Sequence, residues 1–359
     1  MSRIHRIEGE NISTMRLVQL KAGNIRRVAV VEEPNLRFIQ GSRPGGSNIG
    51  GFDSVYALAQ AAIATKRKLT DLVSELLTEE LIDYDPVYRR DGAWKLLPPV
   101  DHPNEPARCL VSGTGLTHLG SARDRQSMHI EQTQQKEGEL TDSMKMFRWG
   151  VEAGRPGPNA VGIAPEWFYK GNGSIVEPPG APLLVPTYAE DGGEEAEIAV
   201  AYLIGPDGQP WRIGMVPGNE FSDHRFEKRN YLNLAGSKLR SCSIGPELTI
   251  NPRFDSVPGK VTIEREGTVL WSQPIATGED EMCHSLRNVE HHHFKFALHR
   301  RPGDLHLHFL GAHSLSFGHV QLKDGDTMEV QFQEFGRPLR NPVHIAPGPD
   351  APIDVRPLT

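Results

Sequence analysis

The sequence predicts an α+β protein with two parts, a small N-terminal α/β domain over residues 1–105 and a mainly β domain with covering helices over residues 106–359. Three observations support this prediction. Residues 14–40 alternate short apolar runs with turn residues, as paired strands do. Residues 54–78 carry apolar side chains at helical spacing. The proline-rich segment 95–107 is typical of a linker, so we place the domain boundary there.

Strands dominate the second part of the chain. Cys109 begins a short strand that ends at Ser112, just before a glycine-rich turn. The clearest strand patterns cover residues 194–205, 259–265, 304–310 and 326–334, and helices are expected over 140–152 and 284–299. Because the expected helices are few, we predict that they cover a predominantly β architecture.

The composition is that of a globular protein and excludes several classes of function. A net charge of -7 with no basic block argues against a nucleic-acid partner. Residues 1–13 lack the apolar core of a secretory signal, and no apolar run is long enough to span a membrane. The odd number and wide spacing of Cys109, Cys242 and Cys283 do not suit disulfides or zinc. We therefore expect reduced thiols in a cytoplasmic protein with no membrane partner.

Two glutamates open the clearest strand of the second part. In the run from Gly193 to Ile204, side chains two residues apart point to the same face, so Glu195 and Glu197 project together. Two adjacent carboxylates repel each other unless a cation lies between them. Hard oxygen ligands suit Mg²⁺, Mn²⁺ or Ca²⁺. The alternative is an ordinary solvated strand edge with two acidic residues.

An acid and a lysine follow this pair along the chain. Asp223 lies in a polar turn, where it is either a third metal ligand or a helix N-cap. Lys238 lies near a strand-to-turn junction, where a lysine usually occupies the surface. Together with Glu195 and Glu197 they form an ordered series of three acids and a lysine. This series predicts a metal site built from the three carboxylates.

The series resembles the fumarylacetoacetate hydrolase superfamily. In that family an E-x-E pair on a strand and an Asp in an N-D turn bind Mg²⁺ or Mn²⁺, a following lysine supports the site, and an F-x-K motif precedes the pair. The matching residues are Glu195, Glu197, Asp223, Lys238 and the segment Phe168-Tyr169-Lys170. Counterparts of the C-terminal family motifs are Pro302-Gly303-Asp304, Gly311-Ala312, Gly325-Asp326 and Gly336 to Asn341. The resemblance covers roughly residues 106–345 and implies a mixed β-roll fold and a homodimer.

One feature of the family's hydrolases is missing. Those enzymes carry a histidine and a glutamate one helical turn apart after the first core strand, and this dyad activates the attacking water. Ser121 and Asp124 occupy the corresponding places here. Water activation without a positioned base loses roughly 10²- to 10⁴-fold in rate, so carbon–carbon hydrolysis is not expected. The segments Gly113 to Gly120 and Pro165 to Lys170, with the long N-terminal region, look like a branch that dehydrates 2-keto-3-deoxy sugar acids.

The resemblance implies a magnesium-dependent dehydratase of a 2-keto-3-deoxy-D- or L-pentonate, of the arabinonate or xylonate type, in non-phosphorylative pentose catabolism. A metal-stabilised enolate forms, C3 loses a proton, the C4 hydroxyl leaves, and 2-oxoglutarate semialdehyde results. Mn²⁺ or Ca²⁺ is an alternative to Mg²⁺. Three other functions stay open: hydrolysis of acylpyruvate-like β-diketo acids, Schiff-base chemistry on Lys238 or Lys170, and non-catalytic binding of a sugar acid.

Several side chains are candidates for the acid, base and substrate-binding roles. Glu166, just upstream of the metal strand, is the first candidate for base or acid, with a surface loop as the alternative position. His118 is the second, because imidazole titrates near neutral pH. Lys170 is expected to contact the substrate or hold Glu166, and Lys238 to support the metal carboxylates. The candidates for holding the substrate are Ser112, Thr114, Arg225 and Ala312.

Overall fold

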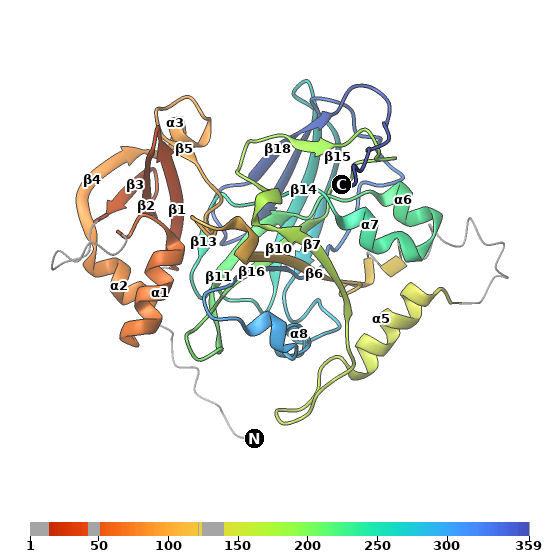
Figure 1. Cartoon of the computed structure of the whole chain (residues 1–359), viewed down its shortest axis with the longest axis horizontal. Coiled ribbons are helices and arrows are strands. Elements are labelled where there is room, and N and C mark those ends of the chain that lie inside the picture. The colour runs from red at the N-terminus through yellow and green to blue at the C-terminus, as the bar shows by residue number, and fades with distance from the viewer. Residues whose placement is uncertain (1–13, 42–50, 121, 124–139, 359) are drawn as a thin grey trace, which may run out of the picture.

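The computed structural model describes residues 14–41, 51–120, 122–123 and 140–358. Two β-sheets dominate this part of the chain, and the helices are few and short (Figure 1). The predicted α+β class is therefore confirmed. No helix within the described ranges combines the length and the apolar character that a membrane crossing requires.

Four N-terminal strands form an antiparallel meander at one end of the larger sheet. They are β1 (Arg16–Ala22), β2 (Ile25–Glu32), β3 (Asn35–Ile39) and β4 (Leu77–Asp83). Between β3 and β4 the chain forms helices α1 (Val55–Thr65) and α2 (Leu69–Glu75). The Ala57 N–H donates to Oγ of Ser54 at 3.2 Å, and this cap begins α1. The predicted N-terminal strands and the helical pattern after them are confirmed.

The N-terminal meander continues into the rest of the sheet. Strand β1 pairs with β13 (Leu248–Thr249), so that Leu17 lies opposite Leu248. One buried apolar cluster also includes both Leu17 and Leu307, which belong to different parts of the chain. A shared sheet and a shared core therefore connect the two parts of the chain. The domain boundary near residue 105 stays a prediction.

Beyond β13 the larger sheet continues through five strands in the spatial order β11, β10, β16, β6 and β7. Their bounds are Pro210–Asn219 for β11, Ala196–Ile204 for β10, Leu305–Phe309 for β16, Cys109–Gly115 for β6 and Glu166–Asn172 for β7. Strands β16 and β6 run parallel, and the other neighbours among these five are antiparallel. Every residue of β10 is buried, as expected for a strand covered on both faces.

A second sheet of five strands packs on the larger one, with the order β15, β14, β17, β18 and β9. Their bounds are Thr268–Thr277 for β15, Val257–Arg265 for β14, Thr327–Phe332 for β17, Leu339–Ile345 for β18 and Leu183–Val185 for β9. An apolar cluster that includes Val200, Val261 and Val330 lies between the sheets, and Val289 of α8 (Leu286–Phe294) joins it.

Short elements connect these layers. They are α3 (Tyr84–Tyr88), β5 (Lys95–Leu96), η1 (Pro106–Arg108), α5 (Asp142–Ala153), η2 (Gly173–Ile175), β8 (Val176–Glu177), α6 (His224–Arg229), η3 (Tyr231–Asn233), α7 (Leu234–Lys238), β12 (Cys242–Ile244) and η4 (Ala297–Arg300). The helix predicted over 284–299 is interrupted: α8 ends at Phe294 and the separate turn η4 follows. The strand predicted over 194–205 is β10, and Glu195 lies one residue before its start.

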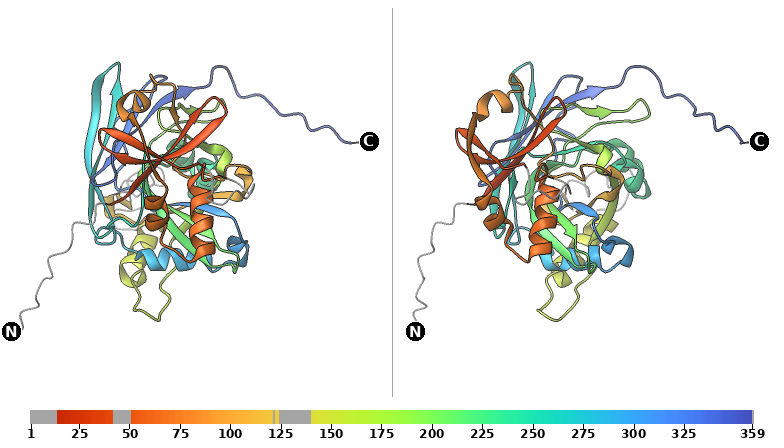
Figure 2. Two further views of the ribbon diagram at one scale, coloured as in Figure 1. Left: turned by 90° about the vertical axis from the view of Figure 1, so that its left-hand side faces the viewer. Right: turned by 60° about the vertical axis from the view of Figure 1, so that its left-hand side comes forward.

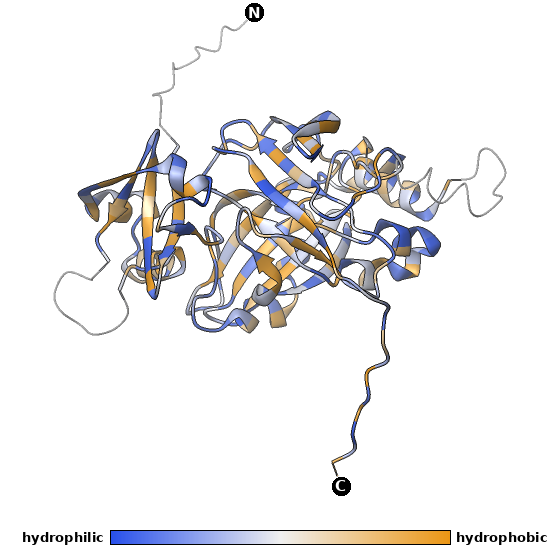
Figure 3. Ribbon diagram, turned by 90° about the horizontal axis from the view of Figure 1, so that it is seen from above, coloured by the Kyte–Doolittle hydropathy of each residue, from blue (hydrophilic) through white to orange (hydrophobic). Residues whose placement is uncertain are grey.

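The outer views show where the chain leaves this body. After β18 the C-terminal segment extends away from the sheets, and its residues 347–358 are exposed (Figure 2). Hydrophobic residues are concentrated on the strands in the middle of the molecule (Figure 3). The candidate site lies at one end of the buried central strand β10.

Candidate metal centre

Three buried glutamates meet at the start of β10. One carboxylate oxygen from each of Glu195, Glu197 and Glu220 lies within 4.8 Å of the others, and no other such group of three occurs among the described residues. The hairpin of β10 and β11 explains the meeting, because its register places Glu197 opposite Gly218. The Glu220 N–H then donates to the Glu195 carbonyl at 2.9 Å, just beyond the paired strands. Glu195 and Glu197 therefore share a face as predicted.

The third carboxylate differs from the one that the sequence pattern suggested. Asp223 lies outside the cluster: its Oδ1 accepts the Phe226 N–H at 3.0 Å and so caps α6. Its Oδ2 accepts from Arg240 Nη2 at 2.9 Å. Both oxygens are thus engaged by a helix terminus and an ion pair, which is the N-cap alternative raised above. Glu220 takes the third place in the cluster instead.

A signal for Glu220 is present in the sequence. Asn219-Glu220 has the same order, an amide followed by an acid, as the N-D turn of the superfamily, with one more methylene in the acid. Asn219 is the last residue of β11, and its Oδ1 accepts the N–H groups of Glu195 at 3.3 Å and Phe221 at 3.2 Å. The amide side chain therefore fixes the backbone on both sides of the hairpin end, so Asn219 helps to hold the cluster together.

Two buried lysines neutralise most of the charge of the cluster. Lys238 Nζ lies 2.5 Å from Glu195 Oε1 and 2.5 Å from Glu220 Oε2. Lys170 Nζ lies 2.6 Å from Glu220 Oε1, and the side chains of both lysines are fully buried. Three carboxylates against two ammonium groups leave one negative charge if all are ionised. This surplus favours a further cation among the oxygens.

Lys170 uses all its donors within the protein. Besides Glu220, its ammonium group donates to the carbonyl oxygens of Phe221 at 2.7 Å and Lys238 at 3.0 Å. The three N–H bonds are therefore occupied, which leaves no lone pair for attack on a carbonyl carbon. The sequence suggested that Lys170 contacts substrate or holds Glu166. The structure instead assigns it to Glu220 and to the backbone around α7.

Burial makes the ionised forms of the three carboxylates energetically unfavourable when no cation is bound. Burial, followed by the charges of Glu195 and Glu220, raises the pKa of Glu197 well above its ordinary range. The Gly311 N–H donates to Glu197 Oε2 at 2.7 Å and offsets part of this shift. Burial likewise raises the pKa of Glu220, against the effect of its lysine partners. A bound divalent cation removes this penalty, because it attracts all three carboxylates.

His224 holds Glu195 from the side of α6. Its Nε2 donates to Glu195 Oε1 at 3.0 Å, and Phe317 packs edge-on against the imidazole with ring centroids 5.4 Å apart. Burial opposes protonation, but the hydrogen bond and the charge of Glu195 raise the pKa of His224 overall. Gly193 leaves room for the ring, since a Cβ there would lie 2.2 Å from His224 Nδ1. His224 was not predicted from the sequence.

Glu166 lies on the strand face that contacts the cluster. Glu166, Phe168 and Lys170 alternate along β7 and are all buried. The Phe168 ring centroid lies 4.7 Å from Lys238 Nζ, so this face meets the lysines of the cluster. The Tyr231 hydroxyl donates to Glu166 Oε2 at 3.1 Å and orients the carboxyl group. Glu166 is therefore buried and held in place, and the surface-loop alternative is wrong.

His118 is buried near the strand ends but has threonine partners. Its ring nitrogens are hydrogen-bonded to Thr117 Oγ1 at 2.8 Å and to Thr277 Oγ1 at 3.1 Å. Burial, aided by His313, lowers the pKa of His118 to about 3. The imidazole is therefore neutral at physiological pH. Ser121 and Asp124, the departures from the hydrolase dyad, lie outside the described residues.

Two of the predicted substrate contacts lie on the wrong face of the sheet. Ser112 Oγ and Thr114 Oγ1 are hydrogen-bonded to the two ring nitrogens of His308, at 2.9 and 2.7 Å. Gly113, which lies between them, pairs with Phe309, and Phe309 pairs with Ala199. Ala199 lies two residues after Glu197 on β10, so Gly113 is on the same face of the sheet as Glu197. Side chains at 112 and 114 therefore point to the opposite face from the carboxylates.

The other two candidates lie around the cluster rather than in it. Arg225 is exposed on α6, and its Nε lies 4.0 Å from Asp191 Oδ2. It lines a surface pocket of about 540 Å³ together with Phe317, the residue that packs on His224. Ala312 is buried beside Gly311, whose N–H binds Glu197. Of the two, Arg225 is at the edge of a cavity that could admit an anionic substrate.

No family model and no curated protein matches this sequence. Several solved structures are similar in fold, among them the following three. The apo form of 2-keto-3-deoxy-D-arabinonate dehydratase has a TM-score of 0.66 and 17% identity, over 93% of this chain and 100% of that chain. The same enzyme complexed with magnesium and 2,5-dioxopentanoate has a TM-score of 0.64 and 17% identity, over 92% and 99%. The 5-carboxymethyl-2-hydroxymuconate delta-isomerase of Mycobacterium smegmatis has a TM-score of 0.54 and 14% identity, over 92% and 100%.

These similarities establish the fold. The chain has the fold expected from its resemblance to the fumarylacetoacetate hydrolase superfamily, and the fold of the dehydratase is more similar to it than that of the two isomerases, with TM-scores of 0.64–0.66 against 0.54. At these identities the likeness concerns the fold alone.

Proposed function

We propose that this protein is a divalent-metal-dependent dehydratase that removes water from a 2-keto-3-deoxy sugar acid, with a 2-keto-3-deoxypentonate as the preferred substrate. The buried group of Glu195, Glu197 and Glu220 with Lys238 carries the proposal. It occurs in a fold shared with a dehydratase that has been solved in complex with magnesium and 2,5-dioxopentanoate. 2,5-Dioxopentanoate is another name for 2-oxoglutarate semialdehyde, the product expected from a pentonate.

The residues present fit a hard divalent cation. Three carboxylates supply oxygen atoms within 4.8 Å of one another, without sulfur or imidazole ligands among them. Oxygen-only sites of this kind suit Mg²⁺, Mn²⁺ or Ca²⁺. Glu195, Glu197 and Glu220 would hold the ion, which supplies Lewis acidity to the oxygens of a 2-oxo acid.

The reaction moves one proton and one hydroxyl group. The proton leaves C3, which is acidified by the neighbouring 2-oxo group, and the hydroxyl leaves C4 with a proton as water. The double bond of the resulting unsaturated acid then moves from C3–C4 to C4–C5. The enol formed in this way tautomerises to the C5 aldehyde. Atoms balance with no water added and no oxidant, so the missing hydrolase dyad is no obstacle.

Glu166 is proposed to carry the proton. Its carboxyl group is buried and oriented by the Tyr231 hydroxyl, and it lies on the face of β7 that reaches Lys238. Lys238 fixes Glu195 and Glu220 relative to each other, and Phe168 covers Lys238 and excludes water from it. Schiff-base chemistry is disfavoured at Lys170, because all its N–H bonds are occupied.

The test is a substrate panel with the purified protein. D- and L-2-keto-3-deoxypentonates and an acylpyruvate are each incubated with Mg²⁺ and with EDTA, and 2,5-dioxopentanoate is quantified by mass spectrometry. We expect aldehyde from at least one pentonate with Mg²⁺ alone. Glu166→Gln is expected to lower the rate about 10²-fold or more and to leave metal affinity unchanged. Turnover of the acylpyruvate alone would instead support a hydrolase. Pentonate binding without turnover would support a non-catalytic sugar-acid-binding protein.

A further inference from the structure

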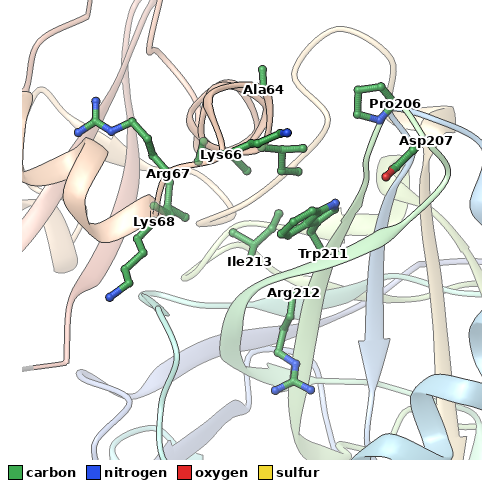
Figure 4. A pocket seen from close by; sticks show the side chains of 13 residues that line it. Ala64, Lys66, Arg67, Lys68, Pro206, Asp207, Trp211, Arg212 and Ile213 are labelled. Atoms are coloured by element: carbon green, nitrogen blue, oxygen red, sulfur yellow. The ribbon is translucent and has the colours of Figure 1, made fainter.

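We infer that a second ligand site lies between the α1–α2 turn and the β10–β11 hairpin, and that it binds a small organic anion with a flat apolar body. A pocket of about 750 Å³ opens there (Figure 4). Its lining includes Ala59, Ala62, Lys66, Asp207, Trp211 and Ile213. Small-molecule sites typically have volumes of about 300–1,000 Å³. The pocket is therefore of a size for a small molecule.

This pocket is separate from the carboxylate cluster. The cluster lies at the start of β10, whereas the pocket is lined by Pro206 and Asp207, which follow the end of the same strand. A strand rises roughly 3.3 Å per residue, so the two ends of β10 are about 26 Å apart. A ligand in this pocket cannot be the molecule that meets Glu195 and Glu197. The inference therefore does not depend on the proposed function.

The apolar part of the pocket is a slot beside an exposed indole. Trp211 is 47% exposed on the hairpin, and Ile213 beneath it is buried. In Figure 4 the Trp211 ring lies across the pocket from α1. The helix presents the small residues Ala59 and Ala62 to the pocket, which leaves room beside the ring. A rigid indole facing small side chains suits a flat ring system, because stacking buries apolar area on both sides.

One cation faces this slot. The Lys66 side chain extends over the pocket toward the hairpin, whereas Lys68 and Arg212 point away from it (Figure 4). Arg212 is already paired, since its Nη2 lies 2.5 Å from Glu290 Oε1. Lys66 has no ion-pair partner in the part of the chain that the structure describes. Its amino group is therefore available for an acidic group on a ligand.

The acid at the opposite wall is already engaged. Asp207 Oδ1 accepts the Gln209 N–H at 3.0 Å and so stabilises the hairpin turn. Arg67 and Lys68, next to Lys66 in the chain, add positive charge around the rim, although Arg67 is paired with Glu75. The balance of unpaired charge at the pocket is positive, which favours an anion over a cation.

The backbone at Lys66 allows a test variant that removes only the amine. Lys66 ends α1 with φ 53° and ψ 39°, in the left-handed region. Glycine is the usual residue at such a helix end, because a Cβ is disfavoured there. Replacing Lys66 by glycine therefore removes the amine without a folding penalty. This gives a test variant whose loss of binding is not explained by misfolding.

The test compares two fluorescent probes that share one ring system. 8-Anilino-1-naphthalenesulfonate carries a sulfonate, and N-phenyl-1-naphthylamine does not. Each is titrated into the full-length protein and its variants. We expect saturable 1:1 binding of the sulfonate probe. Lys66→Gly should weaken that probe about five- to tenfold, as for loss of one charge-assisted contact near solvent, and leave the neutral probe unchanged. Trp211→Ala should weaken both probes.

Matched controls separate this site from other exposed aromatic residues. Trp149 on α5 is 50% exposed, close to the value for Trp211, and Lys21 is an exposed lysine of β1. Trp149→Ala and Lys21→Ala should change neither titration. Equal binding by wild type and Trp211→Ala overturns the inference, as does equal weakening of both probes by Lys66→Gly. Sedimentation velocity provides a further check, because a change of oligomeric state in Trp211→Ala would show that a second copy of the chain covers the pocket.

Discussion

The Nζ atom of Lys170 lies 2.6 Å from Oε1 of Glu220, and both side chains are fully buried. The same ammonium group also donates to two backbone carbonyls, so its position is fixed from three directions. A buried pair of this kind is strongly destabilised when one partner is removed, because the other charge then lies uncompensated in the interior. Lys170 therefore positions a candidate metal ligand.

We predict that Lys170→Met destabilises the metal-free protein by about 3–5 kcal/mol, because Glu220 loses a buried counter-ion. Added Mg²⁺ should restore part of this loss by taking over the charge of Glu220. Urea unfolding with and without Mg²⁺ measures both effects. Lys145→Met is the matched control, since Lys145 pairs with Asp142 on the surface of α5 and should change stability by less than about 1 kcal/mol. Equal losses in the two variants would contradict the assignment.

A second prediction separates Glu220 from Asp223. Glu220→Gln removes a candidate ligand and should weaken Mn²⁺ binding about 100-fold or more, measured by calorimetry or by the EPR signal of free Mn²⁺. Asp223→Asn keeps a capping side chain but removes the charge facing Arg240, so it should lower stability and leave Mn²⁺ affinity within a fewfold of wild type. The opposite ranking of the two affinities would restore Asp223 as the ligand.

A third prediction concerns His224. Residues that orient metal ligands typically contribute about 10- to 100-fold to affinity. His224→Phe removes the hydrogen bond to Glu195 Oε1 but keeps a ring against Phe317, so Mn²⁺ affinity should fall by that amount. His224→Gln can still donate to Glu195 and should recover part of the affinity. Similar affinities for the Phe variant and wild type would show that Lys238 alone is enough to hold Glu195.

The sequence predicted what depends on local pattern. Glu195 and Glu197 were found because side chains two residues apart on a strand point to the same face. This relation does not depend on which strands lie beside it. The buried strand β10 was found from the apolar run that follows Glu197, a pattern typical of a strand covered on both faces. Glu220 was missed although Asn219-Glu220 has the amide-acid order of the family turn, because Asp223 was matched to that turn instead. The approach of Glu220 to Glu195 results from the pairing of Glu197 with Gly218 across a hairpin. A local pattern carries no information on that register.

The errors at Ser112 and Thr114 have a related cause. Both residues lie on β6, which is separated from β10 by β16. Their orientation relative to Glu197 depends on two successive pairings, Ala199 with Phe309 and Phe309 with Gly113. A shift of one residue in either pairing would bring them to the carboxylate face. The pattern of β6 alone predicted a strand correctly, and it could not predict which face meets the site.

A fourth prediction follows from the buried histidines. Burial lowers the pKa of His118, His306 and His308 to about 3 and that of His284 to about 4. In the unfolded chain these histidines bind a proton near pH 6.5. The free energy of unfolding that depends on them is therefore complete above pH 6.5 and falls as the pH drops toward their pKa values in the folded protein. At pH 5 each such histidine should cost about 2 kcal/mol relative to pH 8.

Urea unfolding between pH 8 and pH 5 measures this loss. Buried groups whose pKa is raised in the folded protein, such as Glu197, Glu220 and His224, act in the opposite direction, so the contribution of one histidine is read from the difference between wild type and a variant. His308→Gln keeps hydrogen-bonding partners for Ser112 and Thr114 and should reduce the slope of stability against pH by about one proton. The same slope in His308→Gln and wild type would contradict the neutral, buried state of this ring.

The last prediction concerns the domain boundary. Glu247 is fully buried in the C-terminal part, yet two of its partners come from the N-terminal part: Arg16 at 2.7 Å and the Tyr84 hydroxyl at 3.1 Å. Strand β1 also covers the edge of β13. A fragment of residues 106–359 would expose this edge and leave the charge of Glu247 without Arg16, which costs several kcal/mol.

We therefore expect the 106–359 fragment to lack a cooperative thermal transition by circular dichroism. A separate fragment of residues 1–105, added in excess, should restore the transition, because it resupplies β1 and Arg16 to the shared sheet. Removal of residues 348–358 is the control, since these residues are exposed and extend from the body, and it should leave the transition unchanged. A 106–359 fragment that unfolds cooperatively by itself would show that the two parts are independent domains, as the linker composition of residues 95–107 suggested.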